Sequence, residues 1–286
     1  MTFRNILLLL ICLMNAYFAF VFIRDLMVHK NEVMTEEANT YALPFTSFIM
    51  FFLSTVGISD FAISTSLYPK LNWTSVKKLP GTLNTQCTIP VAVMALAYIT
   101  SIEVSITTLV VCIVSQMIGS YFGAKFAIKL PADKLRVSIG VGMIIAALVI
   151  LGGKFGWLPG GGVATELTGA KLVIAAIALA IFGALNNIGI GSYALTMITV
   201  YLLGLNPAVA FPIMMGAATF SVPIGSVQFV KSGEYSRKIT LFTSTFGVLG
   251  VLCAVFLVTS LDVSLLQWIV VFILIYSAYG MLKQPA

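Results

Sequence analysis

The chain is poor in charged residues. Of its 286 residues only 9% are Asp, Glu, Lys or Arg, whereas a soluble domain carries roughly 25%. With 59% apolar residues and a mean hydropathy of +1.05, too few charges remain to coat a soluble surface. Apolar runs of about 20 residues recur, and each can cross the hydrocarbon core as a helix. The composition therefore predicts an all-α integral membrane protein, a polytopic helical bundle.

Several functional motifs are also missing. The four cysteines stand singly and no C-x-x-C occurs, so neither a disulfide framework nor a zinc site is indicated. There is no G-x-x-x-x-G-K-[ST] motif for ATP. No basic run is interleaved with aromatic residues, so we expect no nucleic-acid partner. We accordingly expect no cofactor and no metal; the expected partners are the lipid bilayer and a small solute.

An enzyme is not expected either. Gly57 and Ser59 faintly resemble an intramembrane serine-protease motif, but a serine nucleophile needs a positioned base. The lone histidine, His29, falls in a charged loop, and no lysine lies in the apolar segment beside Ser59. A second intramembrane carboxylate, which an aspartyl dyad would need, is absent as well.

Gaps between charged residues predict the membrane spans. The spans are 5–23, 43–69, 79–99, 104–128, 137–152, 171–203, 207–230, 239–260 and 263–282. We read the first as a retained helix, because no small-residue cleavage site follows it. One membrane domain is expected, in four parts: a first helix and loop (1–42), repeat 1 (43–152), a linker (153–170) and repeat 2 (171–286).

The two repeats are visible as internal similarity. A shift of 132 residues lays "VGISDFAISTSLYPKL" (56–71) over "IGIGSYALTMITVYLL" (188–203), with four identities in sixteen positions. The same shift lays Pro80 on Pro212. The aligned glycine, proline and turn positions indicate a duplication that leaves the first helix outside.

Loop charge predicts that the second copy is inverted. Loops 70–78, 125–136 and 231–238 are rich in Lys and Arg and are placed in the cytoplasm. Segment 171–203 must then begin and end outside, which a hairpin of two short helices turning near 186–191 would do. Segment 43–70 would be the matching hairpin, turning near "VGIS". The alternative is that both are ordinary tilted helices and that the charge bias misleads.

Asp60 is the only charged residue between Glu37 and Lys70. A carboxylate at membrane depth is costly, so it marks an ion or substrate path by default. At a helix break it is a proton-coupling candidate, or it caps the helix start. Ser192 takes its place in the second repeat.

Neutral polar groups around the two breaks could form an anion site, because hydroxyls, amides and helix N-termini bind anions without a fixed positive charge. The alternatives are hydrogen bonds between helices and simple turn chemistry. The candidate substrate-binding residues are Gly57, Ser59, Asn84, Thr85, Gln86, Asn186, Asn187, Gly189, Gly191, Ser192, Thr219 and Ser221. Gly119 and Gly123 form a G-x-x-x-G motif, which we interpret as a helix-packing face.

Segment 116–151, "QMIGSYFGAKFAIKLPADKLRVSIGVGMIIAALVIL", resembles the TauE/SafE family of bacterial sulfite exporters and related permeases. The G-x-x-x-G helix, the basic turn with Leu130 and Pro131, and the Leu-Arg start of the next helix carry the likeness. "FVKSGEYSRK" (229–238) resembles the equivalent turn of the second repeat. Members often carry a glycine-rich run at the start of each repeat; of it only Gly57, Gly189 and Gly191 remain here.

This resemblance implies a secondary transporter in a bacterial plasma membrane that exports a small sulfur-containing anion such as sulfite or an organosulfonate. Proton coupling through Asp60 is one expectation. A channel-like anion pore, and a permease for another small anion such as a carboxylate, stay open as alternatives.

Overall fold

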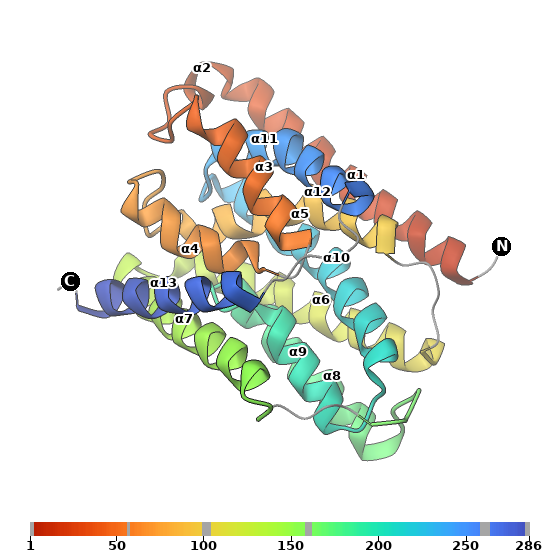
Figure 1. Cartoon of the computed structure of the whole chain (residues 1–286). Coiled ribbons are helices and arrows are strands. Elements are labelled where there is room, and N and C mark those ends of the chain that lie inside the picture. Colours follow the sequence, from red (N-terminus) through yellow and green to blue (C-terminus); the bar gives the residue numbers. More distant parts are fainter. Residues whose placement is uncertain (1–2, 56–57, 99–103, 158–161, 258–263, 284–286) are drawn as a thin grey trace.

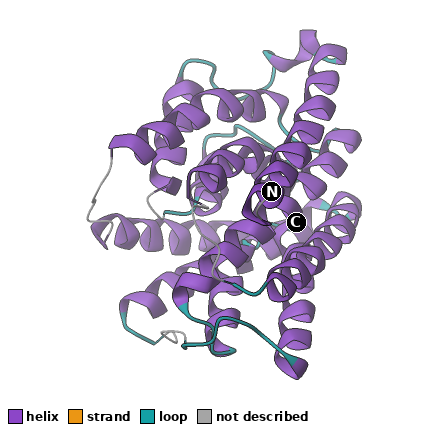
Figure 2. Cartoon of the chain, turned by 90° about the vertical axis from the view of Figure 1, so that its right-hand side faces the viewer, coloured by secondary structure: helices purple, strands orange, loops and turns teal. Residues whose placement is uncertain are grey.

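The computed structural model describes residues 3–55, 58–98, 104–157, 162–257 and 264–283. Within these ranges every regular element is a helix, and turns and one isolated β-bridge join them (Figure 2). The helices are α1 (Phe3–Val28), α2 (Lys30–Val33), α3 (Ala42–Thr55), α4 (Asp60–Lys70), α5 (Leu79–Tyr98), α6 (Ile106–Lys129), α7 (Ala132–Lys154), α8 (Gly169–Asn186), α9 (Ser192–Leu202), α10 (Pro207–Ser232), α11 (Arg237–Phe242), the π-helical turn η1 (Thr243–Gly247), α12 (Val248–Leu257) and α13 (Ser264–Lys283). The all-α prediction is confirmed.

Six helical segments of the described chain are long and apolar enough to cross a bilayer. They are α1, α6, α7, α8, α10 and the continuous run from α11 to α12. Large apolar side chains such as Phe122, Phe126 and Ile177 are exposed on the outside, as expected of a surface that faces lipid. By contrast, 83% of the most apolar window of α10 is buried, so α10 is the central helix. Figure 1 shows α7 and α13 side by side at one edge and α1 at the opposite edge. The chain is a multi-pass membrane protein.

Both predicted helix breaks are confirmed. α3 ends at Thr55 and α4 begins at Asp60; α8 ends at Asn186 and α9 begins at Ser192. The polar segment 84–88 lies within α5, which runs without interruption through Pro90. Because a proline lacks the N–H that would bond one turn back, it weakens a helix but need not break one that its neighbours hold.

The α8–α9 pair is a hairpin whose two ends lie on one side of the bundle. The Lys171 Nζ at the start of α8 donates to the Leu203 carbonyl at the end of α9, at 3.0 Å. The linker pairs with the turn after α9: Gly162 N donates to Leu205 O at 2.8 Å, and Asn206 N donates to Ala164 O at 2.9 Å. Loops with little positive charge therefore gather at this end.

The Lys-rich and Arg-rich loops gather at the other end of α6. Lys77 Nζ donates to the carbonyls of Ile128 and Leu130 at 2.6 and 2.7 Å, which satisfies the C-terminus of α6. The Glu36 carboxylate, just before α3, accepts the backbone N–H groups of Arg237 and Lys238 at 3.1 Å. Since α3 starts after Glu36 and α4 ends before Lys77, both ends of the α3–α4 pair lie on this side. The positive-inside rule assigns this side to the cytoplasm.

Glycines let the broken segments pack closely on their neighbours. A Cβ at Gly119 of α6 would overlap the backbone of Ala180 in α8. In the other half, a Cβ at Gly250 of α12 would overlap the backbone of Phe48 in α3. The packing interpretation of the G-x-x-x-G motif is confirmed, because Gly123 likewise lies against Ala184.

We expect Gly119→Ala and Gly250→Ala to lower the free energy of unfolding by about 1–3 kcal/mol, since overpacking forces two helix backbones apart. The measurement is the melting temperature of the detergent-purified protein. Gly280→Ala is the matched control, because a Cβ there meets open space. An unchanged melting temperature for Gly119→Ala would show that α6 and α8 do not touch through this surface.

Candidate functional site

A cavity of about 1080 Å³ lies between the two helix breaks. Its polar wall comes from the turns before α4 and α9, and its apolar wall from α5, α7, α10 and α13. The predicted site residues on its wall are Ser59, Asp60, Asn186, Gly189, Gly191 and Ser192. Gly57 lies outside the described residues. The structure thus brings together the residues of the two aligned segments, although 132 positions separate them in the sequence.

The N-termini of α4 and α9 meet this cavity. The first N–H groups of a helix have no partner within it and carry a partial positive charge. At α4, the Ser59 hydroxyl accepts from Ala62 N at 3.3 Å as an N-cap. At α9, the cap residue is Gly191, which has no side chain to accept such a bond. Instead, Ser192 N donates to Asn186 Oδ1 at 3.1 Å.

Asp60 is buried at the first position of α4. Its Oδ1 accepts from the Ser54 hydroxyl at 3.0 Å. No described residue donates a hydrogen bond to its Oδ2. A carboxylate oxygen without a partner in such a place is costly, which favours a proton or a positively charged ligand there.

Asn186 connects the cavity to the polar patch predicted on α5. Its Nδ2 donates to Asn84 Oδ1 at 2.8 Å, and Asn84 Nδ2 donates to the Asn186 carbonyl at 3.3 Å. The amide of Asn186 thus satisfies both Asn84 and the start of α9. This reciprocal pair fixes the end of α8 against the middle of α5, and so positions the α9 N-terminus.

The other candidate residues lie behind the cavity wall and bond to the protein. Thr85 pairs with Thr240 at 2.7 Å; Gln86 Nε2 donates to Ser64 Oγ at 2.7 Å; Asn187 Nδ2 donates to Ser120 Oγ at 3.0 Å; Thr219 donates to Met215 O at 2.8 Å; Ser221 Oγ accepts from Gln116 Nε2 at 3.0 Å. These bonds favour the helix-to-helix alternative for Asn84, Thr85, Gln86, Asn187 and Ser221, whereas the Thr219 hydroxyl bonds within its own helix, α10. Direct contact with a substrate stays a prediction for them.

Two glycines shape the second break differently. Gly189 has a φ of +93°, a left-handed conformation that a side chain would strain, and it packs on Ile139. Gly191 has an ordinary φ of −56°, and a Cβ there would meet open space. The first is needed for the turn, and the second leaves room in the cavity.

Sequence reasoning missed the α7 and α13 side of the cavity. Lys154 and Trp268 lie on its wall, with the Lys154 Nζ 5.1 Å from the centre of the Trp268 ring. α7 begins beside the positively charged loops, so its far end at Lys154 lies on the opposite, outer side. The only sequence feature that could have indicated this wall was Lys154, a lysine at the end of an apolar run and near aromatic residues.

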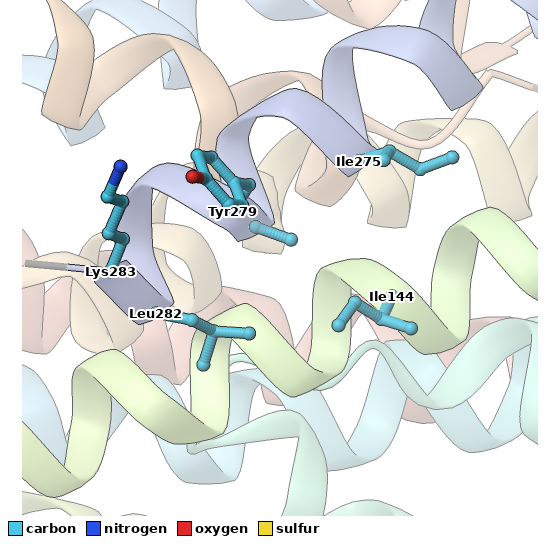
Figure 3. Close-up of a pocket in the computed structure, with 6 residues that line it drawn as sticks. Ile144, Ile275, Tyr279, Leu282 and Lys283 are labelled. Carbon is cyan, nitrogen blue, oxygen red and sulfur yellow. The ribbon is translucent and has the colours of Figure 1, made fainter.

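A second hollow, of about 420 Å³, lies on the outside of the bundle between α7 and α13. Figure 3 shows Ile144 of α7 opposite Leu282 of α13, with Tyr279 and Lys283 nearby. Its walls are almost wholly apolar, as expected of a crevice that lipid chains fill. It offers no comparable set of polar groups.

The geometry is the guide to function, because no protein-family model, no curated protein and no solved structure matches the chain.

We expect the Asn84–Asn186 pair to be energetically coupled. Asn84→Ala and Asn186→Ala should each lower the free energy of unfolding by about 1–3 kcal/mol, because each leaves a buried amide unpaired. The double variant should lose less than the sum, with a coupling of about 0.5–2 kcal/mol. Melting in detergent measures all three. Additive losses would mean that the two amides do not depend on one another.

Proposed function

We propose that the chain is a secondary transporter of a small anion, with its substrate site in the cavity between α4 and α9. The observation that carries the proposal is that two half-helix N-termini face one cavity inside a membrane bundle. Discontinuous helices of this kind bind anionic groups at their N-terminal ends and release them by movement of the surrounding helices. An entirely structural break would not need a cavity of about 1080 Å³ beside it.

The proposed architecture is a pair of inverted repeats. Its support is reciprocal packing: α8 of the second half packs on α6 of the first, and α3 of the first half packs on α12 of the second. The glycine contacts of the two halves also correspond: Phe48 of α3 meets Gly250, and Ala180 of α8 meets Gly119. The shift of 132 positions takes Phe48 to Ala180, and it takes Gly119 to within one residue of Gly250. α5 and α10 pack on each other near the centre.

A buried polar layer favours a transporter over an open anion pore. On the cytoplasmic side of Asp60, the Tyr68 hydroxyl donates to Gln86, and Gln86 in turn donates to Ser64. These side chains are buried, and Tyr68 stacks on Trp73 with ring centres 6.0 Å apart. Together they fill the space between α4 and α5. A transporter alternates such a closed side with an open one, whereas a pore needs a continuous path.

Sulfite and organosulfonates are the substrates that we propose first, on the resemblance of segments 116–151 and 229–238 to TauE/SafE exporters. A carboxylate is the alternative anion. Asp60 is the proposed coupling residue, since a proton on its carboxylate would remove the negative charge that an anionic substrate meets in the cavity.

Thermal stabilisation of the purified protein tests the proposal. We expect sulfite, sulfoacetate or thiosulfate to raise the melting temperature in a saturable way, because a ligand that binds only the folded state stabilises it. Acetate and propionate test the carboxylate alternative. Gly191→Leu, which fills the cavity beside the α9 N-terminus, should remove the response. A melting temperature that no anion moves would contradict an anion transporter.

A further inference from the structure

The two half-helix N-termini in the cavity are not equivalent. α4 begins with a carboxylate, Asp60, and has a hydroxyl N-cap in Ser59. α9 begins with neutral Ser192 after Gly191, and its one capping bond comes from the uncharged amide of Asn186. The positive end of α4 is therefore already balanced by its own residue, while that of α9 is not.

The charged residues of the described cavity wall are Asp60 and Lys154. The Oδ2 of Asp60 has no hydrogen-bond donor from the described chain. Lys154 lies at the end of α7 beside Trp268 of α13, and α13 packs on both α4 and α7. The α4 N-terminus thus has a carboxylate of its own, which suits a positive group, whereas the α9 N-terminus has none and suits a negative one.

We propose that the ligand is zwitterionic: a small molecule whose acidic group binds at the N-terminus of α9 and whose ammonium group binds Asp60. This inference deepens the proposed transport function and rests on it. The ammonium supplies the donor that Oδ2 lacks, and a charge-assisted bond of this kind is stronger than a neutral one. A simple anion could use only the α9 half of the site.

A zwitterionic ligand also explains how substrate and proton could be exchanged. An ammonium group and a proton compete for the same carboxylate, so acidification should weaken binding of the zwitterion but should not weaken binding of a simple anion. The other titratable groups near Asp60 are Tyr68 on α4, Cys87 on α5 and Lys154 on α7. The cavity-lining residues described on α3, α8, α9, α10 and α13 carry no titratable side chain.

Matched ligand pairs test the inference on the full-length purified protein. Dissociation constants are measured by calorimetry for 2-aminoethanesulfonate against ethanesulfonate, and for 3-aminopropanesulfonate against propanesulfonate. We expect the amino compound of a pair to bind about tenfold tighter or more at pH 7.5, the range for a hydrogen bond to a charged group. This advantage should shrink at pH 5.5.

Asp60→Asn should abolish the advantage by weakening the amino compound, whereas ethanesulfonate should bind at least as tightly, because a negative charge leaves the cavity. Thr65→Val is the matched control, because Thr65 lies on the same cavity wall and has no charge; it should retain the preference. If each amino compound binds no better than its partner in the unaltered protein, the zwitterion inference is overturned and the anion transporter stands. If none of the four compounds binds, the zwitterion inference is overturned, and the anion transporter falls as well only if sulfite, thiosulfate and the carboxylates also fail to raise the melting temperature.

Discussion

The structure depends on one constraint: helix ends placed within the apolar interior must have their N–H groups satisfied without water. α4 and α9 both begin at such ends. The protein meets the constraint with a hydroxyl cap and a carboxylate at the first, and with the Asn186 amide at the second. What these groups leave unmet, namely the positive end of α9 and one oxygen of Asp60, defines the chemistry of the cavity.

The contacts around the two helix breaks hold the N-termini of α4 and α9 in place. Glycine contacts bring α8 against α6 and α3 against α12, while the Asn84–Asn186 pair ties α8 to the central helices. At the end with the Lys-rich and Arg-rich loops, Lys77 caps α6 and Glu36 caps α11. Such rigid supports favour binding, because groups that are already held in place lose little conformational entropy when a ligand binds.

The membrane spans and the two helix breaks were predictable from the sequence because charged residues are scarce. Each isolated Lys or Arg marks a loop, and the parity of those loops required hairpins at 43–70 and 171–203. The turn at "NNIGIG" and the start of α4 at Asp60 follow from the glycine and cap residues there. The role of the polar residues in α5 could not be predicted. The sequence does not show whether a side chain such as Gln86 faces a cavity or a hydrogen-bond partner such as Ser64. Nor could it show that α7 and α13, both ordinary apolar spans, close the cavity.

The central claim of the proposed function is that an anion from solution can reach and occupy the cavity at the α9 N-terminus. A cysteine at Gly191 tests it most directly, because its Cβ would meet open space in the cavity. In a background without the four native cysteines, a membrane-impermeant thiol reagent added outside should modify Gly191→Cys, and an organosulfonate, which does not itself react with thiol reagents, should slow the reaction. Val163→Cys, in the exposed linker on the same side as the start of α8 and the end of α9, is the control whose rate the organosulfonate should not change. Failure of the reagent to reach Gly191→Cys from either side of the membrane would contradict the account.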